Sequence, residues 1–272
     1  MRKSVLLLVA SFIMGCKAHA QSWDYVGRLH IPEVSAPFHE YGSLYWGEGV
    51  EDKNNASFAA IQAMFTIGTG QADIRALTYE DGSPIIEKNK LYCSISTRTG
   101  GGGASILELD LGTSQWKLVG IMLGNIDGVY WHTAAAHIMY NRETGIWQVT
   151  VSGHRADHHL YVSHSFSDLR YGVNRLSFRP LDYENKTHGD EDPEIFYWDK
   201  TGKWYLVYSK ESHSIEVQES DSPDADFKHA ANNGTSATGI TTTSIGGQLY
   251  CISGAFQKEN GENNYPIYTF PH

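Results

Sequence analysis

Acidic side chains gather in two short stretches of this 272-residue sequence. They are Glu191, Asp192 and Glu194 in "EDPEIF", and Glu80 and Asp81 in "EDGSPII". Glu194 follows Asp192 by two positions, so both side chains share one face of an extended strand. Clustered carboxylates raise one another's proton affinity, which is what a general acid at neutral pH requires. Both stretches are therefore candidates for acid–base chemistry.

Histidines form a second candidate group, because imidazole titrates near neutral pH and can carry protons. His132 and His137 fall on one predicted inner strand. The following stretch is also rich in histidine, with His154, His158, His159, His164 and His188. The spacing in "HRADHH" matches no established metal-ligand pattern, so we expect exposed loop histidines there and no metal site.

A repeated phrase indicates the elements that must position these groups. "TGKWYLVYSK" (201–210) returns in similar form at 89–97, 144–153 and 246–254, and more loosely at 41–49. The aligned aromatic residues stand at intervals of 47, 55, 58 and 45 residues and are Tyr45, Tyr92, Trp147, Tyr205 and Tyr250. A period of about 50 residues is typical of repeated β units.

Each repeat contains several short runs of β-branched and aromatic residues separated by Gly, Asn and Asp, and no window keeps a helical period. One four-stranded sheet cannot bury both of its faces, whereas several sheets arranged radially pack face to face and protect their edges. The sequence therefore predicts an all-β fold, a five-bladed β-propeller. We expect the repeated phrase to be a middle strand of each blade, with its aromatic residues packed between blades.

The first 20 residues predict an export signal. Arg2 and Lys3 precede an apolar run that is too short for a stable bilayer anchor, and "AHA" (18–20) has the pattern of a cleavage site. We therefore expect a periplasmic or extracellular protein with one domain over residues 21–272. The competing interpretation is a lipoprotein anchored at Cys16, whose preceding residues fit that pattern poorly.

Charge narrows the range of partners. Cleavage removes Arg2, Lys3 and Lys17 and no acid, which turns 21 basic and 31 acidic residues into 18 and 31, a net charge of about −13. Such a charge disfavours nucleic acid as a partner. No second apolar stretch is long enough to span a membrane. We also expect a monomer.

Cys93 and Cys251 occupy equivalent places in the repeated phrase, directly after Tyr92 and Tyr250. A disulfide is open to an exported protein. Equivalent positions of separate blades need not face each other, so two buried core thiols are the preferred interpretation.

Four further phrases carry a family resemblance. They are "VYWHTAAAHIMYNRETGIWQVTVSG" (129–153), "VSHSFSDLR" (162–170), "EDPEIFYWDKTGKWYLVYSK" (191–210) and "QESDSPDADFKHA" (218–230). Together they resemble, in order, the blade motifs of five-bladed propeller glycosidases, especially glycoside hydrolase family 43, in which Asp-Pro begins an inner strand. The resemblance spans roughly residues 76–255.

The resemblance implies an enzyme that removes terminal arabinose, xylose or galactose units from a polysaccharide or oligosaccharide with inversion. Inversion requires a base, an acid and a carboxylate that tunes the acid. Carried over by residue, the tuning carboxylate falls on Asp192 and the base on Asp81, although Gly82 and Ser83 stand where the family has proline. We expect neighbouring side chains to bind the substrate, namely His132, His137, Trp131, Glu80, Glu191 and His188.

The proton donor that the resemblance implies is missing. The family carries it on a Glu that opens the next inner strand, but this chain reads "TSATGITTTSIGGQLY" (235–250) and has no carboxylate between Asp226 and Glu259. Three alternatives stay open. Glu194 or another flanking carboxylate donates the proton, a histidine serves a propeller glycosidase or lyase, or the protein binds sugar without turnover. We expect no cofactor, and a lone structural Ca²⁺ on the propeller axis is compatible with the architecture.

Overall fold

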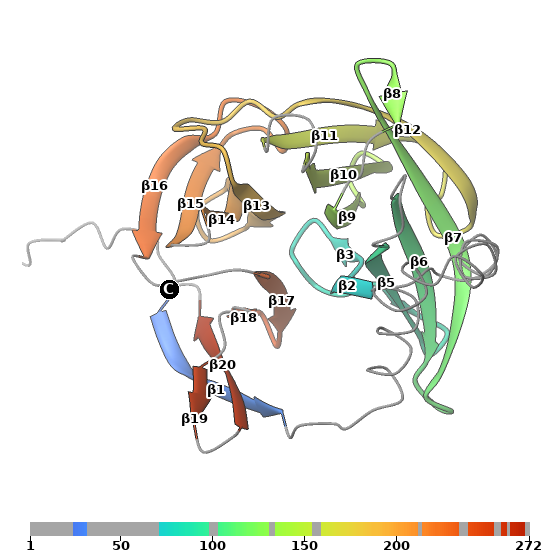
Figure 1. Ribbon diagram of the computed structural model, residues 1–272, viewed down its shortest axis with the longest axis horizontal. Helices are drawn as coiled ribbons and strands as arrows, with labels where there is room; N and C mark the ends of the chain where they lie inside the picture. The colour runs from blue at the N-terminus through green and yellow to red at the C-terminus, as the bar shows by residue number, and fades with distance from the viewer. Residues whose placement is uncertain are drawn as a thin grey trace, which may run out of the picture.

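The computed structural model describes residues 24–31, 71–97, 103–130, 134–153, 159–211, 214–233, 239–252, 257–259 and 262–269. Every regular element in that part of the chain is a β-strand. The strands form sheets around a common centre, as Figure 1 shows. Four blades of four strands are described, named A to D in the order of their inner strands. The repeated unit aligned on Tyr45 lies outside the described residues.

Blades A and B are joined in one sheet. Blade A runs outwards through β2 (Gln71–Ala76), β5 (Lys90–Thr97), β6 (Gly103–Asp110) and β7 (Gln115–Ile126). Blade B runs through β9 (Ala134–Asn141), β10 (Ile146–Ser152), β11 (Leu160–Ser165) and β12 (Gly172–Pro180). The outer strands β7 and β12 pair in parallel. Three short strands are attached to these blades. Strand β3 (Thr78–Tyr79) pairs with β9, β4 (Ile86–Glu87) with β5, and β8 (Val129–Tyr130) with β7.

Blades C and D follow, and the last one draws on both ends of the chain. Blade C contains β13 (Asp190–Trp198), β14 (Lys203–Lys210), β15 (Ser214–Ser220) and β16 (Lys228–Asn233). Blade D contains β17 (Thr241–Ile245), β18 (Gln248–Ile252), β20 (Glu262–Thr269) and β1 (Asp24–Ile31), with β19 (Gln257–Glu259) beside β20. Strand β1 pairs antiparallel with β20, so the first described strand completes the last blade.

The repeated phrase forms the second strand of every described blade. Tyr92, Trp147, Tyr205 and Tyr250 lie on β5, β10, β14 and β18, which confirms the prediction of a middle strand for four of the five copies. The glycine of the phrase is needed in the preceding turn. Gly145 and Gly202 adopt φ values of 71° and 69°, which glycine reaches without steric cost.

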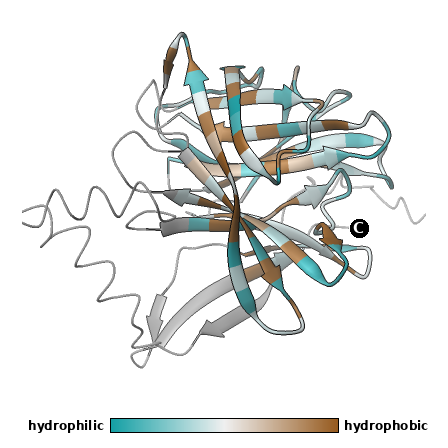
Figure 2. Cartoon of the chain, turned by 90° about the vertical axis from the view of Figure 1, so that its right-hand side faces the viewer, coloured by the Kyte–Doolittle hydropathy of each residue, from teal (hydrophilic) through white to brown (hydrophobic). Residues whose placement is uncertain are grey.

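Buried apolar clusters fill the gaps between successive described blades. Tyr92 and Trp147 share the cluster between blades A and B, and Tyr205 packs with Leu249 between blades C and D. A third cluster lies between blades B and C. The predicted packing of the repeated aromatic residues between blades is confirmed at these three positions, while Tyr250 is only half-buried. Figure 2 shows the alternation of hydrophobic and hydrophilic bands along the strands.

Cys93 on β5 and Cys251 on β18 are both buried free thiols. The preferred interpretation of two core residues is therefore confirmed, and the disulfide alternative is wrong. The described residues include no helix with the length and apolarity that a membrane crossing needs.

Candidate functional site

The four inner strands share one deviation near the end at which they begin, here called the upper end. Each has a residue in the left-handed backbone region in or just before the strand: Asp73 (φ 57°), Ala135 (φ 50°), Asp192 (φ 57°) and Gly239 (φ 61°). At the first three, the pairing with the second strand skips and forms a β-bulge. Positive φ is uncommon without glycine and marks a backbone held by its surroundings. The bulges therefore define equivalent positions around the centre.

Serines of the repeated phrase hold two of these bulges. The hydroxyl oxygen of Ser96 on β5 accepts a hydrogen bond from the Ala135 N–H at 2.7 Å. The hydroxyl oxygen of Ser152 on β10 accepts one from the Asp192 N–H at 2.9 Å. Each serine lies near the end of a second strand and binds the inner strand of the next blade. The phrase therefore positions the site as well as the core.

Asp192 is the sequence candidate that lies at the upper end. Its Oδ2 accepts a hydrogen bond from the Gly239 N–H of blade D at 2.6 Å, and its Oδ1 lies 3.4 Å from Nη2 of Arg75 in blade A. The residue is only 4% exposed. A carboxylate enclosed in this way acts on neighbouring groups mainly through its charge, because little of its surface reaches water. This placement suits the tuning role better than that of a base.

Glu194 lies beside Asp192, as predicted, but it is a core residue. It is 1% exposed, and its Oε2 accepts hydrogen bonds from the N–H of Thr242 at 2.7 Å and from the Thr242 hydroxyl. Its Oε1 lies 3.6 Å from Nη1 of Arg75. Burial raises the pKa of Glu194, although Arg75 and Thr242 oppose the rise. Because both oxygens face protein groups, the proposed role of Glu194 as donor to a substrate is corrected to a structural one.

His137 is also part of the core. It is 3% exposed, and its Nδ1 accepts a hydrogen bond from the Ile195 N–H at 3.2 Å. The Nε2–H of the neutral ring then donates to the Thr78 hydroxyl oxygen at 3.0 Å. Burial, with a smaller effect of Arg75, lowers the pKa of His137 to about 3. The predicted contact of His137 with substrate is therefore corrected, because a neutral, enclosed imidazole links β9 to β3 and to β13 of blade C instead.

Asp81 and Glu80 lie at the opposite, lower end of the ring. The carbonyl oxygen of Glu80 accepts a hydrogen bond from the N–H of Tyr197 at 2.6 Å, and Tyr197 follows Asp192 by five residues on β13, roughly 15 Å along an extended strand. The Glu80 and Asp81 carboxylates both accept hydrogen bonds from Arg142 at 2.8 Å. The expectation that Asp81 acts as the base beside Asp192, with Glu80 near the substrate, is therefore wrong. The "EDGSP" stretch forms a turn after the inner strand.

The other predicted residues divide between the upper end and the undescribed part of the chain. Glu191 is half-buried and directly precedes Asp192 on β13. His188 is exposed just before the same strand, and its ring stacks on His159 with centroids 5.6 Å apart. Trp131 and His132 lie outside the described residues. Within the described ranges, no group of three or more His, Cys, Asp or Glu side chains is arranged to hold a metal ion.

Asp73 is the acidic residue at the upper end that sequence analysis missed. It occupies in blade A the bulge position that Asp192 occupies in blade C, with the same φ of 57°. Arg75, two residues later, donates a hydrogen bond to the Pro193 carbonyl oxygen at 2.9 Å, so the two bulges lie near one another. Asp73 is half-buried, whereas Asp192 is enclosed. The only sequence signal for Asp73 is its place in "QADIRA", near the start of a strand, and it lacks the proline that follows Asp192 in "EDPEIF".

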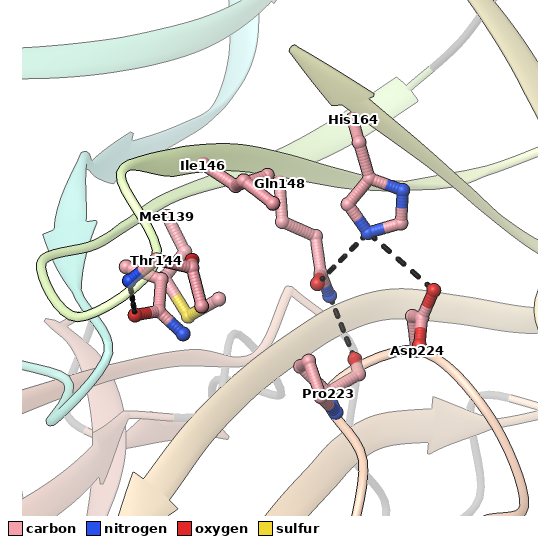
Figure 3. Close-up of a pocket in the computed structure, with 8 residues that line it drawn as sticks. Met139, Thr144, Ile146, Gln148, His164, Pro223 and Asp224 are labelled. Carbon is pink, nitrogen blue, oxygen red and sulfur yellow. Dashed lines mark hydrogen bonds and ion pairs between the residues drawn. The ribbon is translucent and has the colours of Figure 1, made fainter. Parts of the chain in front are cut away.

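A pocket of about 310 Å³ lies near the lower end, between blades B and C. Figure 3 shows the side chains that line it, among them Gln148, His164 and Asp224. Nε2 of His164 lies 3.3 Å from Oε1 of Gln148 and 3.5 Å from Oδ2 of Asp224. The Gln148 amide nitrogen donates to the Pro223 carbonyl oxygen at 2.8 Å. Burial lowers the pKa of His164, and Asp224 opposes this effect. These contacts tie β10 and β11 to the loop between β15 and β16, away from the upper end.

Comparisons with known proteins concern the fold. No protein-family model and no curated protein matches this sequence. A GH43_1 enzyme from Xanthomonas citri is similar in structure, with a TM-score of 0.50, 14% identity and coverage of 69% of this chain and 67% of the other. An exo-1,5-alpha-L-arabinanase from a bovine ruminal metagenomic library has a TM-score of 0.50 at 11% identity, with coverage of 68% and 71%.

A thermostable family-43 glycoside hydrolase has the same TM-score of 0.50 at 16% identity, with coverage of 68% of this chain and 69% of the other. These likenesses concern the overall fold. The chain therefore has the five-bladed β-propeller fold of the family 43 glycoside hydrolases, with four of its blades described.

Proposed function

We propose that this protein is an exported, monomeric glycoside hydrolase that removes terminal arabinose, xylose or galactose units from a polysaccharide or oligosaccharide with inversion. The observation that carries the proposal is the pair of carboxylates at equivalent bulges of the upper end, Asp73 in blade A and Asp192 in blade C. The similarity of the fold to family 43 glycoside hydrolases supports the class of reaction.

The two carboxylates suit different roles because their surroundings differ. A base that activates water must reach that water, and Asp73 is the less buried of the pair. Asp192, held by Gly239 and Arg75, presents a fixed negative charge that raises the proton affinity of a nearby acid. We therefore assign Asp73 as the base, in place of Asp81, and Asp192 as the tuning carboxylate.

A panel of aryl α-L-arabinofuranosides, β-D-xylosides and β-D-galactosides tests the proposal with the wild type, Asp73→Asn and Asp192→Asn. We expect turnover of at least one glycoside by the wild type and loss of most of it in both variants. Proton NMR of the first product should show the anomer opposite to that of the substrate. Retained turnover in Asp73→Asn would contradict the assignment of Asp73 as the base. A product with the same anomeric configuration as the substrate would contradict inversion.

A second candidate function is sugar binding without turnover, and one observation favours it. At the start of the inner strand of blade D, where the resemblance implies a donor Glu, the Gly239 N–H points to Asp192 instead. Calorimetric titration with arabinose, xylose and galactose separates the two functions. Binding by a wild type that hydrolyses none of the aryl glycosides would establish the binding protein, and His132→Ala would then show whether the histidine outside the described residues takes part.

A further inference from the structure

Arg75 reaches across the upper end of the ring. It lies on β2 of blade A, yet its guanidinium contacts three groups of β13 in blade C. Nη1 donates to the Pro193 carbonyl oxygen at 2.9 Å and lies 3.6 Å from Oε1 of Glu194, while Nη2 lies 3.4 Å from Oδ1 of Asp192. A planar guanidinium presents five N–H donors in a fixed fork, so it can serve several oxygens at once. Arg75 therefore joins the two strands that carry the bulged aspartates.

The three charged side chains of this contact are buried together. The Arg75 side chain is 2% exposed, the Asp192 side chain 6% and the Glu194 side chain 1%. An isolated charge at such a place would be costly, and each of these groups depends on its partner. The other titratable groups around them are Glu191 on β13, Asp73 on β2, His137 on β9 and Cys251 on β18. His137 is neutral at ordinary pH, so Arg75 is the cation among the described residues of this cluster.

We propose that Arg75 is a positioning residue of the upper site: its guanidinium fixes the Asp192 carboxylate across the centre of the ring and keeps it ionised. The claim about Asp192 stands on geometry and charge alone, and its meaning for catalysis rests on the proposed function. Glu194 shares the cation from the core side, and its carboxyl group is held by Thr242 of blade D. Arg75 thus determines how much negative charge Asp192 presents to a bound sugar.

The test is a titration of the Asp192 carboxyl carbon by ¹³C NMR in protein labelled at aspartate. Asp192→Asn assigns its resonance by removing it. In Arg75→Met the pKa of Asp192 should rise by about 1 to 3, because a carboxyl group beside a cation loses that amount of support. Arg75→Lys should restore most of the difference. An unchanged titration in folded Arg75→Met would overturn the proposal.

Two further variants keep the result unambiguous. Arg142→Met removes a guanidinium that also pairs with two carboxylates, at the lower end, and should leave the Asp192 titration unchanged. If Arg75→Met does not fold, Arg75→Met with Glu194→Gln removes one buried acid together with the cation and should still raise the pKa of Asp192. An equal shift in Arg142→Met, or no shift in the double variant, would contradict the positioning role.

Activity provides a separate result. If the wild type hydrolyses a glycoside, the acidic limb of its kcat profile should move to higher pH in the double variant, in step with the NMR titration. In Arg75→Lys the limb should stay close to its wild-type position. If the Asp192 pKa measured by NMR rises while the acidic limb of the kcat profile stays in place, Arg75 does not act on catalysis through Asp192. A wild type without turnover would end the proposed function, while the titration would still decide the role of Arg75.

Discussion

The two ends of the ring each hold one arginine between two carboxyl groups. The upper group is Arg75 with Asp192 and Glu194, and the lower group is Arg142 with Glu80 and Asp81. The side chains of the upper group are at most 6% exposed, whereas those of Arg142 and Asp81 are 46% and 48% exposed. Water screens the lower charges, so the two groups differ in how much the loss of one partner changes the free energy of unfolding. The comparison shows that burial, and not the presence of paired acids, distinguishes the candidate site.

The largest difference between the two ends should be in turnover. Asp73→Asn at the upper end should lower kcat on an aryl glycoside by about 10²- to 10⁴-fold, because it removes the assigned base. Asp81→Asn at the lower end should change kcat by less than about twofold, since its carboxylate binds Ser83 and Arg142 in a turn. Initial-rate measurements on both purified variants check this. A severe loss in Asp81→Asn alone would reverse the assignment.

Stability should show the next difference. Arg75→Met leaves buried acids without their cation and should lower the free energy of unfolding by about 3–5 kcal/mol. Arg142→Met breaks an exposed pair and should cost about 0–1 kcal/mol. Urea denaturation followed by tryptophan fluorescence measures both. Equal losses would mean that the lower group is as important to the fold as the upper one.

A smaller effect on stability is expected at the hydrogen bonds that shape the Asp192 bulge and the Asp81 turn. Ser152→Ala removes the acceptor of the Asp192 N–H at a left-handed position and should cost about 1–3 kcal/mol, as for other buried groups left unpaired. Ser83→Ala, in the turn that holds Asp81, should cost less than about 1 kcal/mol, because water replaces the lost donor. Urea denaturation of the two variants provides the measurement.

The pH dependence of stability should have opposite signs at the two ends. The pKa of Glu194 is raised by burial, so its contribution is complete below the ordinary value of 4.5 and is lost as pH rises through the folded-state pKa. Burial also opposes ionisation of Asp81, but hydrogen bonds from Ser83 and Arg142 outweigh it and lower the pKa. The Asp81 contribution is therefore present above 3.8 and lost as pH falls through the folded-state pKa.

Urea denaturation between pH 3 and 8 compares Glu194→Gln with Asp81→Asn. The first variant should lose part of the decline in stability towards neutral pH, and the second should lose part of the decline towards acid pH. Profiles parallel to that of the wild type would show that neither carboxyl group contributes as described.

Sequence patterns were sufficient for the architecture because the blade is a local unit. The aromatic phrase around Tyr205 recurs in each described blade, and its period indicates the ring. The preceding turn contains glycine in blades B, C and D, whereas Lys88 and Asn89 take the positive φ values in blade A. The closing pair of β1 and β20 could not be assigned, since nothing near Asp24 indicates a partner close to Thr269. Strand pairing over that separation depends on the whole ring.

The candidate site was only partly predictable. Asp192 stands out because proline follows it, whereas Asp73 is followed by isoleucine and its bulge has no signature in the sequence. Alternation along a strand placed Glu194 near Asp192, but its burial depends on Thr242 and Arg75 from two other blades. Asp81 was mistaken for a site residue because an acidic residue shortly before a proline looks the same in a turn as at the start of an inner strand.

The pairing of β1 with β20 also affects how the molecule is assembled and taken apart. A ribosome releases Asp24 long before it has made Thr269, so β1 has no pairing partner until β20 has been synthesised. Until β20 is in place the β18 side of the blade is an unpaired edge, and such edges can pair with a neighbouring chain. A protease cut that frees β1 would expose the edge of β20 in the mature molecule.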